Sequence, residues 1–237
     1  MKKFYMVIFL FFFSCLSYAQ NETYNYGSYF ITTSASTLKA FKSDSTLFYQ
    51  KKFSNPLIFA VDLDSDNVNE MVVIDNQVLS GKKKYTLFVY NTLDSLYLVD
   101  SVFSGSMEPR QVYSEDLNTI LLATGNATFD SLNTIDSLSS LPLNFWKFED
   151  GALFLANASV YQLYINENNN LIDILDEYYS QNGRTCESTL KVKGIIASGF
   201  INYYNVGETT LASQFLKNYY LCNDIGNFKQ FLLKSFK

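Results

Sequence analysis

Histidine is absent from this 237-residue sequence, and cysteine and proline are rare, with three of each. Without histidine there is no imidazole acid–base catalysis, no His-containing triad and few of the usual zinc sites. The cysteines form no Cys-x-x-Cys pair, and no Gly-x-x-x-x-Gly-Lys phosphate loop occurs. These absences remove the commonest catalytic chemistries, so we expect no catalytic residues and a role in binding or structure.

Clusters of basic residues are also nearly absent. The chain has 18 Lys and Arg against 23 Asp and Glu, a net charge of −5, and its only basic run is residues 82–84. A nucleic-acid-binding surface requires clustered Lys and Arg. We therefore expect no nucleic-acid partner.

The first 19 residues have the order of a secretory signal peptide. Two lysines precede the apolar run "FYMVIFLFFFSCL", and residues 17–19 (Ser-Tyr-Ala) form a small-x-small end. The run is too short to span a bilayer as a mature helix, and no second one follows. We expect residues 20–237 to be exported to the periplasm, cell surface or medium. A lipid anchor on Cys15 is the alternative, although the phenylalanines before it fit that motif poorly.

Two cysteines remain after residue 19. Cys186 and Cys222 could form a disulfide in an oxidising compartment or remain two buried thiols, and the sequence leaves both open.

Repeated patterns organise the middle of the chain. "LKAFKSDSTLFYQKKF" from Leu38 and "LFVYNTLDSLYLVDSVF" from Leu87 lie 49 residues apart, and each has the pattern of a strand, an Asp/Ser turn and a strand. "FWKFEDGALFL" from Phe145 has the same pattern with a tighter Asp-Gly turn. "YLCNDIGNFKQFLL" from Tyr220 is a candidate further copy.

A second pattern occurs between these hairpins. Pro56 and Pro109 each open a strand, an acidic turn and an apolar strand. Together the two patterns give four short strands in about 50 residues, the size of a propeller blade. The sequence thus predicts an all-β fold, with residues 20–237 forming one domain of four to five four-stranded antiparallel units in a propeller-like array.

The C-terminal third also fits a second interpretation. "NNNLIDILDEYYSQ" from Asn168 has apolar residues at helical spacing, and "TTLASQFLKNYY" from Thr209 has acceptable helix composition. The alternative fold is therefore α+β, with helices from about residue 168 onward.

One acidic stretch has the pattern of a metal loop. "VDLDSDNVNEMVVID" begins at Val61 and places carboxylates at alternate positions before an apolar strand. Calcium takes six to eight oxygen ligands, and a curled loop can direct such carboxylates to one ion. The position where an EF-hand requires Glu holds Val73, so the loop is not an EF-hand. Four like charges within nine residues repel one another unless a cation lies among them.

Residues 60–75, "AVDLDSDNVNEMVVID", resemble the FG-GAP/VCBS repeat, a calcium-binding blade of β-propellers. The resemblance implies one structural calcium ion bound by side chains and one backbone carbonyl. Ser65 and Asn67 stand where that family usually has Gly. The shorter turn "SEDLNT" at 114–119 is not expected to bind an ion. The implied ligands are Asp62, Asp64, Asp66, Val68 through its carbonyl, and Glu70.

Two further sets of residues are candidates for chemistry. Asp173, Asp176 and Glu177 could supply the carboxylate pair of a glycan hydrolase, although close acids are commoner on a helix face. Asp-Ser followed by Thr, Leu or Val resembles an O-glycosylation site of one bacterial envelope system. Its acceptors would be Ser45, Ser95, Ser101, Ser131 and Ser137.

The expected function is that of an exported cell-envelope or extracellular binding module with one structural calcium loop. Its partner would be an envelope protein or a glycan. The alternatives are a carboxylate-pair glycan hydrolase and a purely structural envelope protein.

Overall fold

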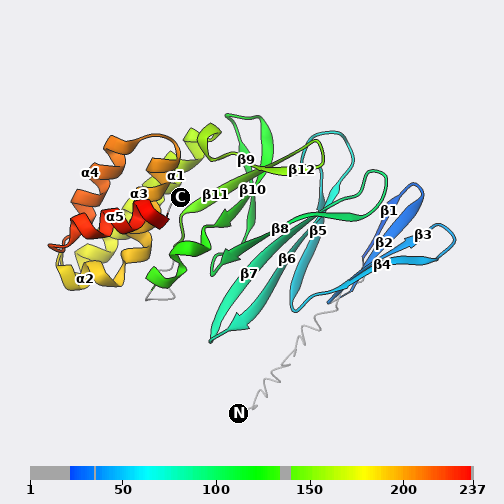
Figure 1. Cartoon of the computed structure of the whole chain (residues 1–237), viewed down its shortest axis with the longest axis horizontal. Coiled ribbons are helices and arrows are strands. Elements are labelled where there is room, and N and C mark those ends of the chain that lie inside the picture. Colours follow the sequence, from blue (N-terminus) through cyan, green and yellow to red (C-terminus); the bar gives the residue numbers. More distant parts are fainter. Residues whose placement is uncertain (1–21, 35, 134–139, 236–237) are drawn as a thin grey trace, which may run out of the picture.

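The computed structural model describes residues 22–34, 36–133 and 140–235, so the expected signal peptide, Cys15 and Ser137 lie outside the described residues. Within this part, strands occupy the first two thirds of the chain and helices the last third (Figure 1). The strands are β1 (Thr23–Tyr26), β2 (Tyr29–Ser34), β3 (Thr37–Lys42), β4 (Leu47–Lys52), β5 (Pro56–Val61), β6 (Glu70–Leu79), β7 (Lys82–Asn91), β8 (Tyr97–Gly105), β9 (Arg110–Ser114), β10 (Thr119–Gly125), β11 (Leu143–Glu149) and β12 (Ala152–Leu155). The α-helices are α1 (Tyr161–Asn182), α2 (Cys186–Lys191), α3 (Lys193–Asn205), α4 (Thr209–Tyr219) and α5 (Ile225–Ser235).

The strands form three four-stranded antiparallel sheets, each built from consecutive strands. We call them sheet A (β1–β4), sheet B (β5–β8) and sheet C (β9–β12). The four-stranded antiparallel unit expected from the sequence is therefore confirmed. The β11–β12 connection is the tight Asp150-Gly151 turn, and both residues have positive φ, as a two-residue hairpin loop requires.

The repeat of 49 residues relates corresponding strands of sheets A and B. Leu38 on β3 and Leu87 on β7 are both fully buried. The register also shifts at the same place in each copy, between Ala40 and Phe41 in sheet A and between Val89 and Tyr90 in sheet B. A bulge adds one residue and increases the local twist, so its recurrence gives the two sheets the same local distortion.

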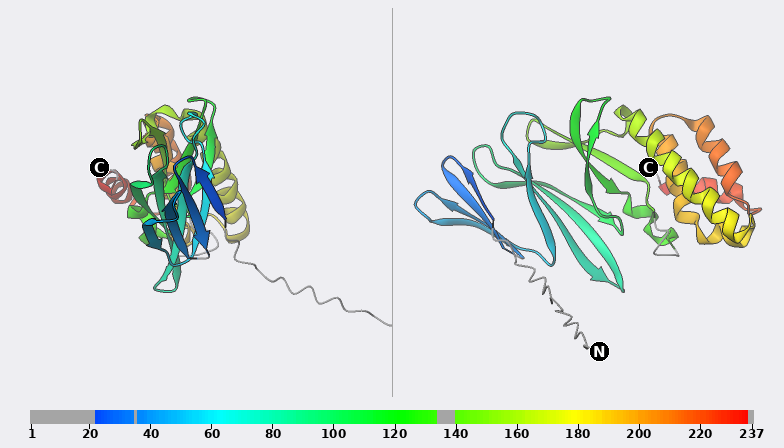
Figure 2. Two further views of the ribbon diagram at one scale, coloured as in Figure 1. Left: turned by 90° about the vertical axis from the view of Figure 1, so that its right-hand side faces the viewer. Right: turned by 180° about the vertical axis from the view of Figure 1, so that it is seen from behind.

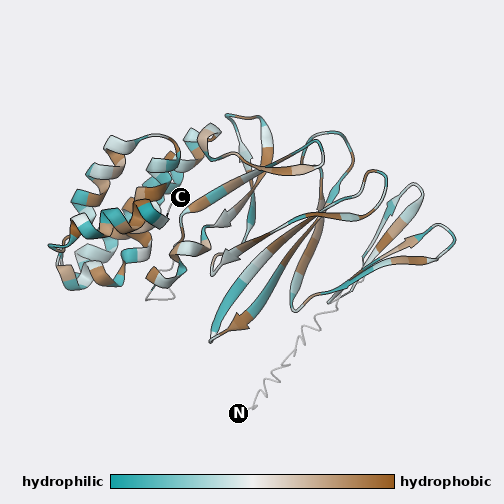
Figure 3. Cartoon of the chain, in the orientation of Figure 1, coloured by the Kyte–Doolittle hydropathy of each residue, from teal (hydrophilic) through white to brown (hydrophobic). Residues whose placement is uncertain are grey.

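The three sheets pack face to face in chain order (Figures 1 and 2). One apolar cluster, including Ile31, Leu38 and Met71, lies between sheets A and B. A second, including Leu87 and Phe148, lies between sheets B and C. In Figure 3 hydrophobic colours mark the strands as well as the helices. The sheets are thus held together by buried side chains from facing strands.

Asp75 holds the connection between β4 of sheet A and β5 of sheet B. Its side chain is buried on β6, and its carboxylate accepts hydrogen bonds from the backbone N–H groups of Ser54 and Asn55 at 2.8–3.1 Å. A buried carboxylate is costly unless hydrogen bonds satisfy it. The link between the two sheets therefore has a defined conformation.

The all-β expectation is wrong for the C-terminal third, where the α+β alternative holds in its coarse form. Helix α1 begins at Tyr161, seven residues before the expected start, and most of the hairpin expected from Tyr220 lies in helix α5. Phe228 and Leu232, four residues apart, are buried on one face of α5. Among the described residues there are three sheets rather than four or five, and these sheets do not close into a ring.

The helices cover the free face of sheet C. Phe145 of β11 packs edge to face against Tyr164 of α1, with ring centroids 4.9 Å apart. The Tyr164 hydroxyl donates to the carbonyl of Leu143 at 2.8 Å. Buried Asn202 of α3 accepts from the Leu143 N–H and donates to Asn168 of α1, both at 3.1 Å. Sheet and helices therefore share both an apolar core and a buried polar network.

Cys186 and Cys222 are bonded as a disulfide, with Cα atoms 4.7 Å apart. The bond connects the start of α2 to the segment between α4 and α5. The helical part is thereby cross-linked over 36 residues of sequence.

Candidate metal centre

The acidic loop connects β5 to β6, the first two strands of sheet B. Carboxylate oxygens of Asp62, Asp64 and Glu70 all lie within 4.8 Å of one another. Glu70 pairs with Val61 at the end of the β5–β6 ladder, so the antiparallel register returns the chain to the position of Asp62. Asp62 and Glu70, eight positions apart in the sequence, are thus brought close together.

Hydrogen bonds within the loop hold its backbone in place. The Asp62 carboxylate accepts from the N–H of Ser65 at 2.7 Å and from the N–H of Asn67 at 3.1 Å. Ser65 and Asn67 have φ values of 66° and 69°, in the left-handed region. These are the two positions where the resembling repeat usually has Gly, and the backbone adopts the conformation that glycine favours.

Glu70 is the most buried of the three acids, with 2% of its surface exposed. One carboxylate oxygen accepts from the N–H of Leu63 at 2.9 Å. Burial, followed by the nearby charges of Asp64 and Asp66, raises the pKa of Glu70 to about 7, although the bond from Leu63 acts in the opposite direction. A carboxyl group in these surroundings is costly to ionise unless a cation compensates it.

Of the remaining two predicted ligands, Asp66 and the Val68 carbonyl, Asp66 is placed differently. The Asp66 carboxylate accepts from the N–H of Val68 at 2.7 Å, a local turn contact, and Asp66 is outside the group of converging acids. The structure therefore brings together three of the four predicted carboxylates. Carboxylate oxygens are the ligands that hard cations such as Mg²⁺, Ca²⁺ and Mn²⁺ prefer.

The electrostatics of the loop are unbalanced. Within the part of the chain that the structure describes, no Lys or Arg forms an ion pair with Asp62, Asp64 or Glu70. Burial, then the charges of Asp66 and Asp62, also raises the pKa of Asp64. A divalent cation at the convergence point would reverse both effects, because it favours the ionised carboxylates.

The shorter acidic turn between β9 and β10 contacts the start of helix α1. Asp116 accepts a hydrogen bond from the N–H of Gln162 at 3.1 Å, at the start of α1. A carboxylate at a helix N-terminus satisfies a backbone donor that has no partner within the helix and interacts favourably with the helix dipole.

The candidate hydrolase acids lie along the exposed surface of α1. Asp176 accepts from the Tyr219 hydroxyl at 3.1 Å and lies 3.9 Å from the Arg184 guanidinium, while Glu177 accepts from Gln181 at 3.2 Å. These contacts are those of a helix surface. The candidate glycan acceptors Ser45, Ser95, Ser101 and Ser131 are all exposed, in a turn, a turn, strand β8 and a 3-10 helix (Ala127–Leu132) respectively.

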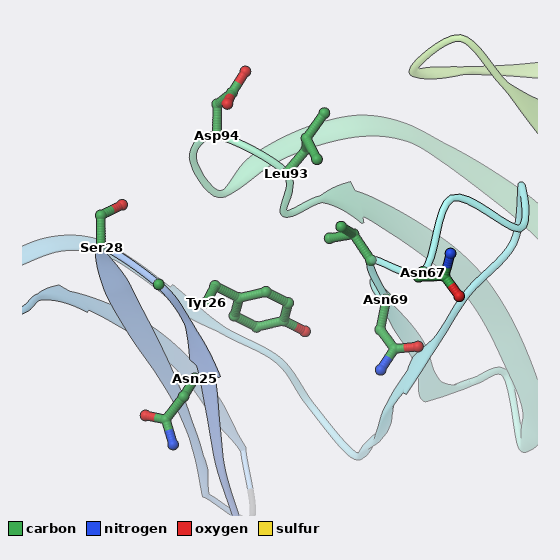
Figure 4. A pocket seen from close by; sticks show the side chains of 9 residues that line it. Asn25, Tyr26, Ser28, Asn67, Asn69, Leu93 and Asp94 are labelled. Atoms are coloured by element: carbon green, nitrogen blue, oxygen red, sulfur yellow. The ribbon is translucent and has the colours of Figure 1, made fainter.

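A hollow that sequence analysis missed adjoins the acidic loop (Figure 4). Its volume is about 430 Å³, and it lies between the β1–β2 turn, the end of the acidic loop and the β7–β8 turn. The lining residues that bear most on recognition are Tyr26, Asn67, Asn69, Leu93 and Asp94. No short motif predicts such a site, because its walls come from turns of two different sheets.

No protein-family model matches the chain, and neither a curated protein nor a solved structure matches it. The resemblance of residues 60–75 to the FG-GAP/VCBS repeat therefore stays a prediction from the sequence. Among the helices that the structure describes, none has both the length and the apolar character needed to cross a membrane.

Proposed function

We propose that this protein is an exported binding module of the cell envelope or extracellular space, in which a calcium ion stabilises the loop between β5 and β6. The observation that carries the proposal is the convergence of Asp62, Asp64 and buried Glu70 within 4.8 Å. Calcium would link these carboxylates and relieve their mutual repulsion. The ion's role would be structural, since a loop that wraps one cation leaves little room for a substrate.

The repeated sheets support the same proposal. Four-stranded antiparallel units, a matching bulge in two of them and an acidic loop between the first two strands are features expected of propeller-like blades. We infer that the three sheets form an open, propeller-like array that ends at the helices. Such an array presents rows of turns at its edges, and turns on a rigid scaffold are common binding surfaces.

The test is a thermal melt of the purified protein in excess EGTA and in 1 mM calcium. With a dissociation constant near 10 μM, 1 mM calcium adds about 2.7 kcal/mol of stability by mass action. For a domain of this size the melting temperature should rise by about 5 to 10 °C. Magnesium at the same concentration should add less, because it requires stricter octahedral geometry.

Two variants make the melt specific. Asp64→Asn removes one converging carboxylate and should abolish most of the calcium shift. Asp173→Asn makes the same chemical change on the exposed surface of α1 and should keep the full shift. Equal shifts in both variants, or no shift in the unmodified protein, would make the loop an ordinary acidic turn and remove the basis of the proposal.

A further inference from the structure

Two hollows lie next to each other along the edge where the turns of sheets A and B meet. The first, shown in Figure 4, has a volume of about 430 Å³, and the second about 380 Å³. Ser28 and Asp94 line both, so the two form one groove. Small-molecule pockets are usually between about 300 and 1,000 Å³, and each half falls within that range.

The groove offers hydrogen-bonding side chains without partners in the protein. In the described residues, the side chains of Asn67, Asn69 and Asp94 make no hydrogen bond to another protein group, and all three are exposed. Each Asn amide supplies an acceptor and two donors, and the carboxylate supplies acceptors. Paired donors and acceptors of this kind match vicinal hydroxyl groups, each of which can donate and accept.

Aromatic and aliphatic side chains form the rest of the wall. Tyr26 stacks against Tyr29 with ring centroids 5.4 Å apart, and Phe48 meets Tyr29 edge to face at 5.7 Å. Phe48 is 38% exposed and Leu93 56% exposed, so both present apolar surface to the groove. Figure 4 shows Tyr26 reaching from the β1–β2 hairpin toward Asn69, with Leu93 on the β7–β8 side.

The charge of the groove argues against an anionic ligand. Asp94 and Asp44 line it together with a single base, Lys42, and the acidic loop adjoins it at Asn67. A phosphate or an acidic peptide would be repelled by this excess of carboxylates. A neutral ligand with many hydroxyl groups and apolar C–H faces fits both the amides and the aromatic wall.

We propose that this groove, formed by turns of sheets A and B, binds a neutral oligosaccharide. The inference rests on the proposed function, because it names the class of ligand for that binding module. Asn67 and Asn69 would bind sugar hydroxyl groups from one side of the groove, and Asp94 would bind them from the other. The apolar side chains of Tyr26, Phe48 and Leu93 would contact the C–H faces of the sugar rings. Two joined hollows give room for more than one sugar ring.

The groove also borders the candidate calcium loop. Residues 67–69 belong to both, and the Thr92 hydroxyl donates to the Asn69 carbonyl beside the groove. Calcium in the loop would hold this wall in one conformation and lower the cost of ordering it on binding. Binding of the oligosaccharide should therefore be weaker in EGTA.

The experiment uses the full chain, made in a host that adds no O-glycans, because Ser95 lines the second hollow. The protein is applied to an array of neutral oligosaccharides in 1 mM calcium, and the strongest hit is measured by calorimetry. Asp94→Asn replaces one carboxylate acceptor with an amide donor, and Asn69→Ala removes an amide. Each change should weaken binding about tenfold through lost hydrogen bonds to the sugar. The matched changes Asp173→Asn and Asn170→Ala, on the exposed face of α1, should leave the affinity unchanged.

The outcomes separate this inference from the calcium proposal. No signal on the array, or affinity unaffected by the two groove variants, overturns the groove as a saccharide site even where calcium still raises the melting temperature. Binding confined to sulfated glycans or to peptides overturns the neutral ligand class. Saccharide binding that depends on Asp94 in a protein without a calcium shift supports the groove and rejects the metal loop alone.

Discussion

Ser65 and Asn67 both have left-handed backbone conformations, although neither is glycine. Asn tolerates this region because its short polar side chain can hydrogen-bond locally, whereas Ser has less compensation. In the described structure the Ser65 backbone N–H bonds to Asp62, which holds the residue in this conformation. The curled conformation of the loop therefore includes a serine with a strained backbone.

Replacing this serine by glycine should stabilise the protein. Ser65→Gly relieves a left-handed penalty of about 1 to 2 kcal/mol and costs about 0.5 to 1 kcal/mol through the freer unfolded chain. We expect the free energy of unfolding to rise by about 0.5 to 1 kcal/mol in urea titrations. Ser65→Ala keeps the same conformation and should bring no gain, so an alanine variant as stable as the glycine variant would contradict the strain argument.

Glu70 makes the stability of the calcium-free protein depend on pH. Its pKa is raised from about 4.5 to about 7, so between these values the folded protein holds a proton that the unfolded chain has lost. The free energy of unfolding should therefore fall as pH rises through this window, by about 3 kcal/mol. Asp64, whose pKa is also raised, acts in the same direction.

The measurement is urea unfolding in EGTA at several pH values between 5 and 7.5, a range set by the two pKa values of Glu70. Glu70→Gln should flatten the slope, because it removes the titrating group and keeps an acceptor for the Leu63 N–H. In saturating calcium the slope should nearly disappear, since the metal keeps the folded carboxylates ionised, as they already are in the unfolded chain at these pH values. An unchanged slope in Glu70→Gln would assign the pH dependence to other groups.

Residue patterns predicted the convergence of three acidic side chains but not the position of a fourth. The alternating acids predicted a curled loop, and Asp62, Asp64 and Glu70 do converge. Asp66 does not, because its carboxylate bonds to the N–H of Val68 two residues away. Spacing shows which side chains can face one point, but a local backbone donor competes for each carboxylate.

At the scale of elements, the strands and the body of the first helix were predictable from local patterns, whereas the start of that helix was not. Alternating burial and an Asp-Gly turn are local signals, and hairpins depend on them. Helix α1 lacks a side-chain cap at its own N-cap residue Val160, and its first turn is instead bonded by Asp116, 46 residues earlier. A helix start defined by such a distant contact leaves no signal in the neighbouring sequence.

Two glycines should respond in opposite ways to the same substitution. A Cβ on Gly199 of α3 would lie 2.3 Å from Cζ of buried Phe215 on α4, whereas a Cβ on Gly226 of α5 meets nothing within 4 Å. Gly199→Ala should cost about 1 to 3 kcal/mol through overpacking. Gly226→Ala should add up to about 1 kcal/mol, because alanine favours helix.

The measurement is urea unfolding of both alanine variants, and each variant serves as the control for the other. Loss of stability in Gly226→Ala would show that α5 does not form the helix described here. A neutral Gly199→Ala would show that α3 and α4 can separate enough to admit a methyl group, contrary to their close contact at Phe215.

At the scale of the whole molecule, four apolar clusters follow one another from sheet A to the helices. The buried bonds from Asn202 and Tyr164 to Leu143 add polar contacts across the boundary between sheet C and the helices. Among the residues that the structure describes, the helices supply the buried contacts to that face of sheet C, so the strands and helices depend on each other. Residues 22–235 should therefore unfold as one unit.

Two probes report on the two parts separately. Trp146, the single tryptophan, lies on β11 of sheet C, and far-ultraviolet circular dichroism follows the helices. The thermal transitions seen by the two probes should coincide in EGTA. Calcium bound in sheet B should raise both melting temperatures equally, because in two-state unfolding a local gain in stability stabilises the whole domain. Asn202→Ala leaves the Leu143 N–H without its partner and should lower the free energy of unfolding by about 1 to 3 kcal/mol. Both melting temperatures should fall together. A calcium shift seen by Trp146 but not by the helices would divide the molecule into two independent domains at the sheet C boundary.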